Sequence, residues 1–103
     1  MSPQKVERAK LKQLTDLPNV GKATAVDLRL LGFNAPDQLA GACPFEMYER
    51  LCQATNCRHD PCVIDVFMSI TDFMNGNPPR PWWDFTERRK HTLRMSAAVP
   101  PAG

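Results

Sequence analysis

Long apolar runs are missing from this chain of 103 residues. Because a helix needs about 20 consecutive apolar residues to cross a bilayer, we expect no transmembrane segment. The first residues lead into charged side chains and not into the apolar region of a signal peptide. Four cysteines in such a chain favour reduced thiols. The sequence therefore predicts a cytoplasmic protein.

The alternation of apolar and polar residues that marks a half-buried strand is also missing. Helical spacing and helix breakers instead predict helices over residues 6–14, 21–31, 44–54 and 61–74, with a single turn between the second and the third. We therefore expect one all-α domain of about four to five helices.

The predicted helices have apolar sides that would form one core. In the helix over 21–31, Val26 and Leu30 stand at helical spacing, and Ala23 lies one turn earlier. The helix over 44–54 is expected to bury Phe45, Tyr48 and Cys52. The helix over 61–74, capped by Asp60, is apolar almost all round and is the predicted centre of the core. Its main apolar stripe consists of Val63, Phe67, Ile70 and Met74.

Charge is unevenly distributed, although the formal net charge is only +2. Residues 1–12 carry a net +3, residues 13–79 a net −4 and residues 80–103 a net +3. We divide the chain into a basic N-terminal arm (1–12), a core domain (13–77) and a Pro/Trp-rich segment (78–103) that clasps the core and ends in a basic, partly disordered tail. Nucleic-acid binding would rely on the basic ends or on backbone amides. The same distribution of charge is also explained, without any such binding, by two chain ends that are exposed to solvent.

Paired carboxylates and a nucleophile–base arrangement are missing as well. We therefore expect a protein that is not an enzyme and that needs no cofactor.

The stretch "LPNVGKATA" (residues 17–25) combines a sharp turn with the start of a helix. Leu17 and Val20 are apolar anchors, and Asn19 and Gly21 tolerate the left-handed backbone conformation. The free N–H groups and the positive dipole end of the new helix suit an anion, and Lys22 adds a charge beside them. The pattern predicts a phosphate-sized anion seated at Val20, Gly21 and Lys22.

This stretch resembles the helix-hairpin-helix motif, in which hairpins bind the nucleic-acid backbone without reading bases. Asn19 replaces the first glycine of the usual motif, and Lys22 stands where proline is frequent. The resemblance implies a small module that binds nucleic acid, with DNA expected, without sequence preference. The alternative is a hairpin that serves only as a corner for helix packing. The predicted binding residues are Asn19, Val20, Gly21, Lys22, Arg58, Arg80, Arg88, Arg89 and Lys90.

Helix-hairpin-helix units often occur in pairs, and "TNCRHDPC" (residues 55–62) aligns with the first turn through Asn56. Because this second turn lacks the glycine, we expect it to pack against the first hairpin as a structural echo. Arg58 and His59 would still be able to reach a phosphate through their side chains.

Cys52, Cys57, His59 and Cys62 are four potential zinc ligands within eleven residues. Structural zinc sites usually contain more closely spaced C-x2-C pairs, and thiols on an apolar helix face commonly serve as small hydrophobes. We expect no metal site, and packing is the preferred role. A redox or detoxification role centred on Cys62, whose pKa a helix N-terminus would lower, is the alternative.

Two adjacent tryptophans, Trp82 and Trp83, follow a proline-rich stretch. Neighbouring side chains on a helix cannot share one buried stripe, so one tryptophan is expected to pin the segment to the core and the other to lie on the surface. An exposed tryptophan beside basic residues could stack on unpaired bases or anchor a partner protein. A protein-interaction module using Trp82 and Trp83 is therefore a further alternative.

The chain is also similar to the bacterial pathogenicity-locus family of helix-hairpin-helix proteins, some of which are labelled mitomycin-resistance proteins. The resemblance rests on "LPNVGKATAVDLRLLGF", "MYERLC", "RHDPCVIDVFMS" and "PPRPWWDFTERRK", in this order. It implies little about function, because the family is largely uncharacterised. Cys43 departs from the aspartate expected as a cap of the third helix, and Cys57 from a glycine or small polar residue.

Overall fold

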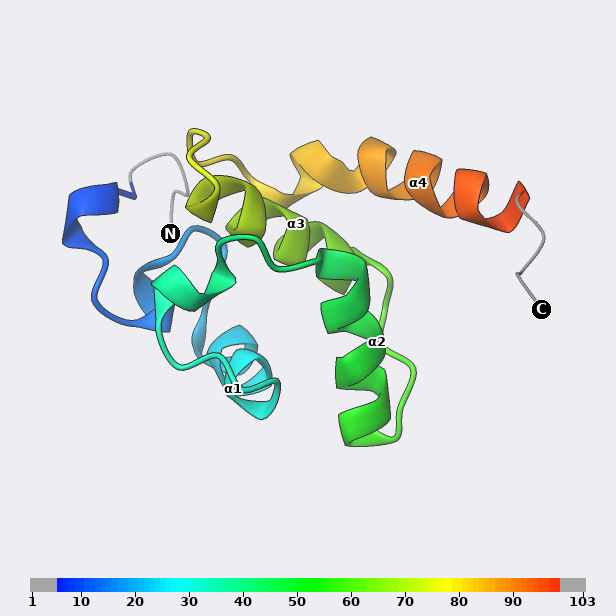
Figure 1. Cartoon of the computed structure of the whole chain (residues 1–103), viewed down its shortest axis with the longest axis horizontal. Coiled ribbons are helices and arrows are strands. Elements are labelled where there is room, and N and C mark those ends of the chain that lie inside the picture. Colours follow the sequence, from blue (N-terminus) through cyan, green and yellow to red (C-terminus); the bar gives the residue numbers. More distant parts are fainter. Residues whose placement is uncertain (1–5, 99–103) are drawn as a thin grey trace.

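The computed structural model describes residues 6–98, and every regular element among them is a helix. The α-helices are α1 (Lys22–Leu30), α2 (Pro44–Thr55), α3 (Cys62–Met74) and α4 (Thr86–Ala98). Short 3-10 turns lie at Arg8–Lys10, Leu14–Asp16, Pro36–Leu39 and Trp82–Phe85. The predicted all-α fold is confirmed (Figure 1). Residues 1–5 of the predicted basic arm and the proline-containing residues 99–103 lie outside the described part of the chain.

The predicted helix over residues 6–14 does not form. The chain instead makes two separate 3-10 turns, because the side chain of Asp16 accepts hydrogen bonds from the N–H groups of Gln13 (3.0 Å) and Lys12 (2.9 Å). The same two bonds lower the pKa of the Asp16 carboxyl group. The arm is held to the end of α3 by Arg8, whose guanidinium lies 4.1 Å from the ring centroid of Phe73.

The three helices of the core end in the same type of turn. The left-handed residue is Gly32 after α1, Asn56 after α2 and Gly76 after α3, with φ of 92°, 49° and 109°. In each case the next N–H group donates to the carbonyl oxygen five residues earlier, over 3.0, 3.1 and 3.3 Å. These Schellman turns satisfy carbonyl groups that a helix end leaves free. Gly32 therefore ends α1, as predicted.

Helix α3 is the centre of the core, as predicted. Its side chains Ile64, Phe67, Ile70 and Phe73 are buried. Figure 1 shows α3 between α4 on one side and α1 and α2 on the other. Burial of one such side chain contributes about 1.5–3 kcal/mol, so α3 supplies much of the stability. None of the helices between residues 6 and 98 combines the length and the apolar character that a bilayer span requires.

The apolar residues noted at helical spacing in α1 do not form its buried side. Val26 and Leu30 are 54% and 55% exposed, whereas Ala25 and Leu28 are buried. Both stripes have helical spacing, and the sequence pattern alone does not choose between them. Val20, just before α1, is fully buried together with Leu28, and we infer that this anchor limits the rotation of the helix.

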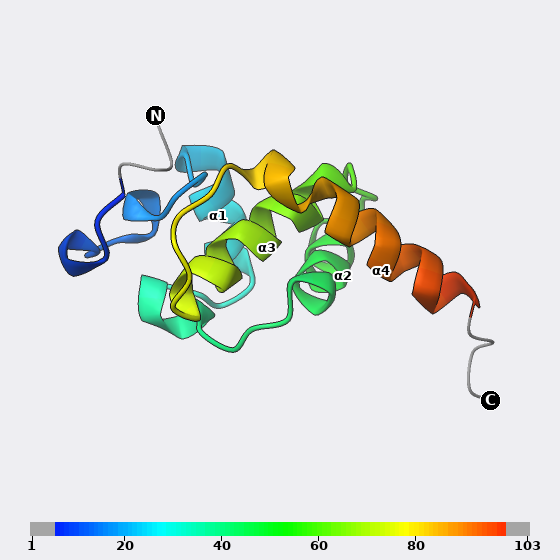
Figure 2. The same ribbon diagram turned by 90° about the horizontal axis from the view of Figure 1, so that it is seen from above.

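The C-terminal segment forms a helix that the sequence analysis did not predict, where a partly disordered tail was expected. Phe85 is buried against α3 at the end of the 3-10 turn, and α4 continues as a helix to Ala98. Arg89 of α4 donates from Nε to Asp65 of α3 over 2.8 Å, and the Thr86 hydroxyl donates to the other Asp65 oxygen over 2.7 Å. These contacts fix the first turns of α4, while its far end projects beyond the other helices (Figures 1 and 2).

Candidate nucleic-acid interface

The turn before α1, residues 17–21, is called the hairpin below, and it is anchored from within. The side chains of Leu17 and Val20 are fully buried, as predicted. Asn19 has the predicted left-handed backbone, with φ of 66°. Its Nδ2 donates to Ser69 Oγ of α3 over 2.9 Å and to the carbonyl oxygen of Arg80 over 2.8 Å. The turn is therefore fixed both to α3 and to the C-terminal segment.

Nothing within the described chain requires a glycine at position 21. Gly21 is the N-cap of α1, and its backbone is extended, with φ of −96° and ψ of −170°, instead of left-handed. Any residue adopts this conformation. A Cβ atom added at Gly21 would have no other atom within 4 Å. The glycines at 32, 41 and 76 differ, because their φ angles are positive and favour glycine.

The first N–H groups of α1 are open. Those of Gly21, Lys22 and Ala23 donate to no acceptor within residues 6–98, because α1 has only begun and Gly21 offers no capping side chain. All three residues are exposed. The N–H group of Val20 instead donates to the carbonyl of Leu17 over 3.4 Å. The N–H group of Val20 is therefore not available to an anion, whereas those of Gly21 and Lys22 are.

Two of the predicted cations, Arg80 and Arg88, share one aromatic ring. Their guanidinium groups lie 5.1 and 5.2 Å from the ring centroid of Phe85. Nε of Arg80 also pairs with Asp84 over 3.3 Å at the surface. The hydrogen bond from Asn19 places the Arg80 backbone beside the hairpin. These contacts connect the hairpin to a pair of surface arginines.

The other predicted cations lie elsewhere. The side chain of Arg89 is only 13% exposed and pairs with Asp65, which is 0% exposed, so Arg89 holds α4 to α3 and is not a surface cation. The bond to Asp65 raises the pKa of the Arg89 guanidinium. Arg58 pairs with Glu49 over 3.3 Å, and the α2–α3 connection that carries it lies on the side of α2 away from α1 (Figure 1). Lys90 is exposed on α4.

The second turn repeats one feature of the first. Asn56, like Asn19, has a left-handed backbone, and these are the two residues other than glycine with positive φ in the described part of the chain. However, α3 begins at Cys62, six residues after Asn56, whereas α1 begins three residues after Asn19. The longer connection shows that the second turn is not a copy of the first.

The two tryptophans are divided as predicted. Trp82 is half-buried and Trp83 is 59% exposed, and their rings meet edge to face at 5.7 Å. Burial of the segment relies mainly on Phe85, which the sequence pattern did not single out. The role of Trp83 in binding a partner stays a prediction.

The thiol groups do not support the redox alternative at Cys62. Burial and the Asp60 carboxylate raise the pKa of this thiol, which opposes the lowered value that the alternative needs. Asp60 caps α3 as predicted, by accepting from the Cys62 N–H group over 2.9 Å. Burial also acts to raise the pKa of Cys52, but the His59 backbone, Arg58 and Tyr48 outweigh it and lower the pKa.

The side chains considered as zinc ligands serve other contacts. Within residues 6–98, no group of three or more His, Cys, Asp or Glu side chains is arranged to hold a metal ion. His59 Nε2 lies 2.8 Å from Thr55 Oγ1. Cys52 is buried in the core, in agreement with the packing role. Cys43 makes no capping hydrogen bond at the start of α2, as its replacement of an aspartate implied.

Sequence reasoning missed two polar residues that position the interface. Ser69 receives the Asn19 side chain, and Asp65 binds Arg89; both are buried in α3. The sequence contained a signal for both residues, because each is a polar side chain inside an apolar helix and such a side chain needs a hydrogen-bond partner when it is buried.

The comparisons with known proteins agree on the family. The family model described as "Pathogenicity locus" (Cdd1) matches residues 7–91. The chain belongs to this family. The matched range includes the hairpin, the core helices and the first turn of α4, so the family assignment made from the sequence blocks is confirmed.

This pathogenicity-locus protein is also similar to a mitomycin resistance protein over most of its length. The mitomycin resistance protein McrB of Streptomyces lavendulae is 42% identical over 80 residues, which cover 78% of this chain and 76% of the relative. No solved structure matches the chain.

Proposed function

We propose that this pathogenicity-locus protein binds the sugar–phosphate backbone of nucleic acid, with DNA as the expected polymer, and does not read bases. Gly21 is the observation that carries the proposal. Its backbone angles do not require glycine, and the position of a Cβ is empty. A residue without a side chain is useful at such a site when an outside group must approach the backbone closely.

The chemistry of the α1 N-terminus supports an anion as that outside group. The N–H groups of Gly21, Lys22 and Ala23 have no acceptor within residues 6–98, and the helix dipole favours negative charge there. A Ser, Asp or Asn at the cap would satisfy these donors internally. Gly21 leaves them for a phosphate, and the exposed Lys22 adds a positive charge.

Further contacts would come from surface cations near the hairpin. Arg80 and Arg88 meet over Phe85, and the Arg80 backbone contacts Asn19. Because few phosphates are neutralised, the affinity should be modest and strongly reduced by salt. Two to three contacts would give a slope of about −2 to −3 for the logarithm of affinity against that of salt concentration on duplex DNA.

Fluorescence anisotropy of labelled DNA tests this proposal. Duplexes of unrelated sequence should bind with equal affinity, and binding should weaken as salt is raised. Labelled single-stranded DNA and RNA of the same length establish which backbone is preferred. Failure to bind any of these polymers at low salt would overturn the proposal.

The name of the relative supports a second proposal, that this chain also protects cells against mitomycin. The support is the 42% identity over 80 residues. A sensitive bacterial host that expresses the chain should tolerate a higher mitomycin concentration than a host that carries the empty vector. Equal sensitivity, with the protein present in soluble form, would contradict this second proposal.

A further inference from the structure

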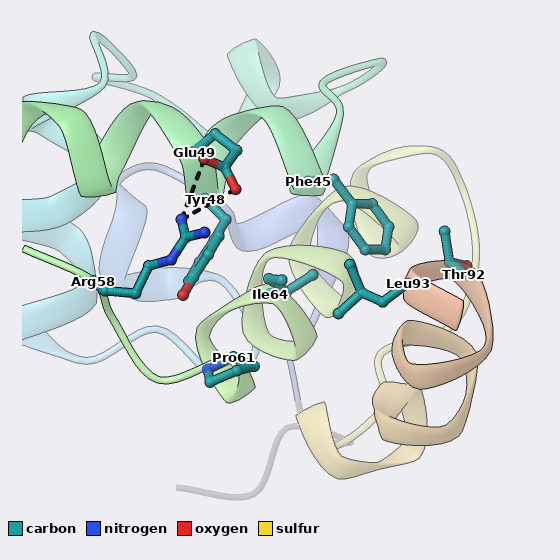
Figure 3. Close-up of a pocket in the computed structure, with 8 residues that line it drawn as sticks. All are labelled: Phe45, Tyr48, Glu49, Arg58, Pro61, Ile64, Thr92 and Leu93. Atoms are coloured by element: carbon teal, nitrogen blue, oxygen red, sulfur yellow. Dashed lines mark hydrogen bonds and ion pairs between the residues drawn. The ribbon is translucent and has the colours of Figure 1, made fainter. Parts of the chain in front are cut away.

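A groove of about 470 Å³ lies between α2, α3 and α4, away from the hairpin. Phe45 of α2, Ile64 of α3 and Leu93 of α4 converge on it, as Figure 3 shows. Tyr48 and Pro61 extend this apolar lining, and Arg58 and Glu49 stand at one end. The volume falls within the range of about 300–1,000 Å³ that is usual for small-molecule sites.

The groove is held open by contacts that do not involve its lining. The Asp65–Arg89 pair and the Asp65–Thr86 bond fix the first turns of α4 against α3. Beyond them, Leu93 reaches back to the groove and is still 39% exposed. The walls therefore exist before any ligand arrives, which lowers the cost of binding.

The polar end of the groove favours an acidic group. NH1 of Arg58 lies 3.3 Å from both Glu49 oxygens, and the guanidinium also interacts with the Cys52 thiol. The side chains of Arg58 and Glu49 are 70% and 58% exposed, so their pair is weak and easily exchanged. The planar guanidinium has further N–H groups suited to a carboxylate. It lies over the Tyr48 ring, 5.8 Å from the ring centroid, so the charge borders the apolar lining of the groove.

We propose that this groove binds a small aromatic molecule that carries an acidic group. The aromatic ring lies among Phe45, Tyr48, Ile64 and Leu93, and the carboxylate or sulfonate pairs with Arg58. The site is separate from the proposed nucleic-acid contact at Gly21, and neither proposal depends on the other.

The test uses 8-anilino-1-naphthalenesulfonate, whose fluorescence rises in an apolar site, and two competitors of equal shape. The dye should bind at one saturable site. The anion 2-naphthoate should displace it about fivefold better than the neutral 2-naphthamide, as expected for one exposed ion pair. Arg58→Gln should abolish this preference, whereas Arg94→Gln, which removes an exposed arginine outside the groove, should retain it.

A second pair of variants tests the apolar part. Leu93→Asn should weaken binding of the dye about tenfold, by removing part of the apolar contact. Met95→Asn is the control, because Met95 is exposed on the same helix but does not line the groove. Because all four substituted side chains are exposed, the variants should keep the thermal midpoint of the parent, which circular dichroism verifies.

Chemical-shift mapping on the parent protein provides a readout independent of mutation. Addition of 2-naphthoate should shift the signals of Phe45, Tyr48, Ile64 and Leu93. Shifts confined to other residues, equal displacement by the two competitors, or unchanged binding in Leu93→Asn would overturn the proposal. Sedimentation that shows a dimer broken by Leu93→Asn would also overturn it, because a second copy would then be the occupant.

Discussion

The amide group of Asn19 donates a hydrogen bond of 2.8 Å to the carbonyl oxygen of Arg80. This bond joins two segments 61 residues apart, the hairpin and the start of the C-terminal clasp. The same Nδ2 reaches Ser69 of α3. The orientation of the open α1 N-terminus therefore depends on the packing of the whole chain and not only on the local turn.

Replacement of Asn19 separates the role of its side chain from that of its backbone. Asn19→Gly keeps the left-handed conformation but loses both hydrogen bonds, so the free energy of unfolding should fall by about 1–3 kcal/mol. Asn56→Gly is the matched control, because Asn56 is also left-handed and its side chain makes no hydrogen bond within the described residues. Urea unfolding measures both. Equal losses of unfolding free energy in the two variants would show that the hydrogen bonds of Asn19 contribute nothing to stability.

Two leucines of α1 test which side of the helix is buried. Leu28 is fully buried and Leu30 is 55% exposed. Leu28→Ala should lower the free energy of unfolding by about 2–5 kcal/mol, because it leaves a cavity in the core. Leu30→Ala should change it by less than about 0.5 kcal/mol. The reverse order in chemical denaturation would mean that α1 is rotated about its axis.

The pair of Arg89 and Asp65 should be needed for stability. Arg89→Met leaves the buried Asp65 carboxylate without its charged partner and should cost about 3 kcal/mol. The adjacent Arg88→Met removes an exposed charge and should cost less than about 1 kcal/mol. Adding Asp65→Asn to Arg89→Met should recover part of the loss, because no charge is then buried. Thermal unfolding of the three variants distinguishes this account from one in which α4 is held by its apolar contacts alone.

The thiol of Cys62 should react slowly with alkylating agents. Burial and the negative charge of Asp60 raise its pKa, so the reactive thiolate is scarce at neutral pH and increases only at alkaline pH. Asp60→Asn keeps a capping oxygen but removes the charge, and should shift the alkylation profile of Cys62 to lower pH. Mass spectrometry of iodoacetamide-treated protein measures the alkylation rate of each cysteine. Rapid neutral-pH alkylation of Cys62 would restore the redox alternative.

The sequence predicted the elements that local chemistry determines. The cap at Asp60, the stop at Gly32 and the left-handed Asn19 depend on near neighbours and were correct. The rotation of α1 was not predictable, because two apolar stripes have helical spacing and local spacing does not choose between them.

Two neighbouring arginines of α4 show why the candidate site was not fully predictable from the sequence. Arg89 and Arg88 are adjacent and equally basic, yet one is bound to a buried carboxylate and the other lies over an aromatic ring. Their roles depend on Asp65 and Phe85, which contact them through the tertiary fold. Helix α4 was missed because its charged sequence has no clear apolar stripe, and Asp65 of α3 supplies the anchor.

Replacement of Gly21 by aspartate tests whether the N-terminus of α1 holds a phosphate of DNA. Gly21→Asp places a capping carboxylate on the open N–H groups of α1, so stability should stay the same or rise slightly, by a few tenths of a kcal/mol. DNA binding at low salt should fall at least about tenfold, because the phosphate seat is filled and negatively charged. Gln53→Glu, an equal change of charge at an exposed position of α2, should reduce binding less than about twofold. We expect DNA binding, measured by anisotropy, to be lost in Gly21→Asp alone, without a fall in the thermal midpoint. Equal binding by Gly21→Asp and the parent protein would show that the N-terminus of α1 is not the contact.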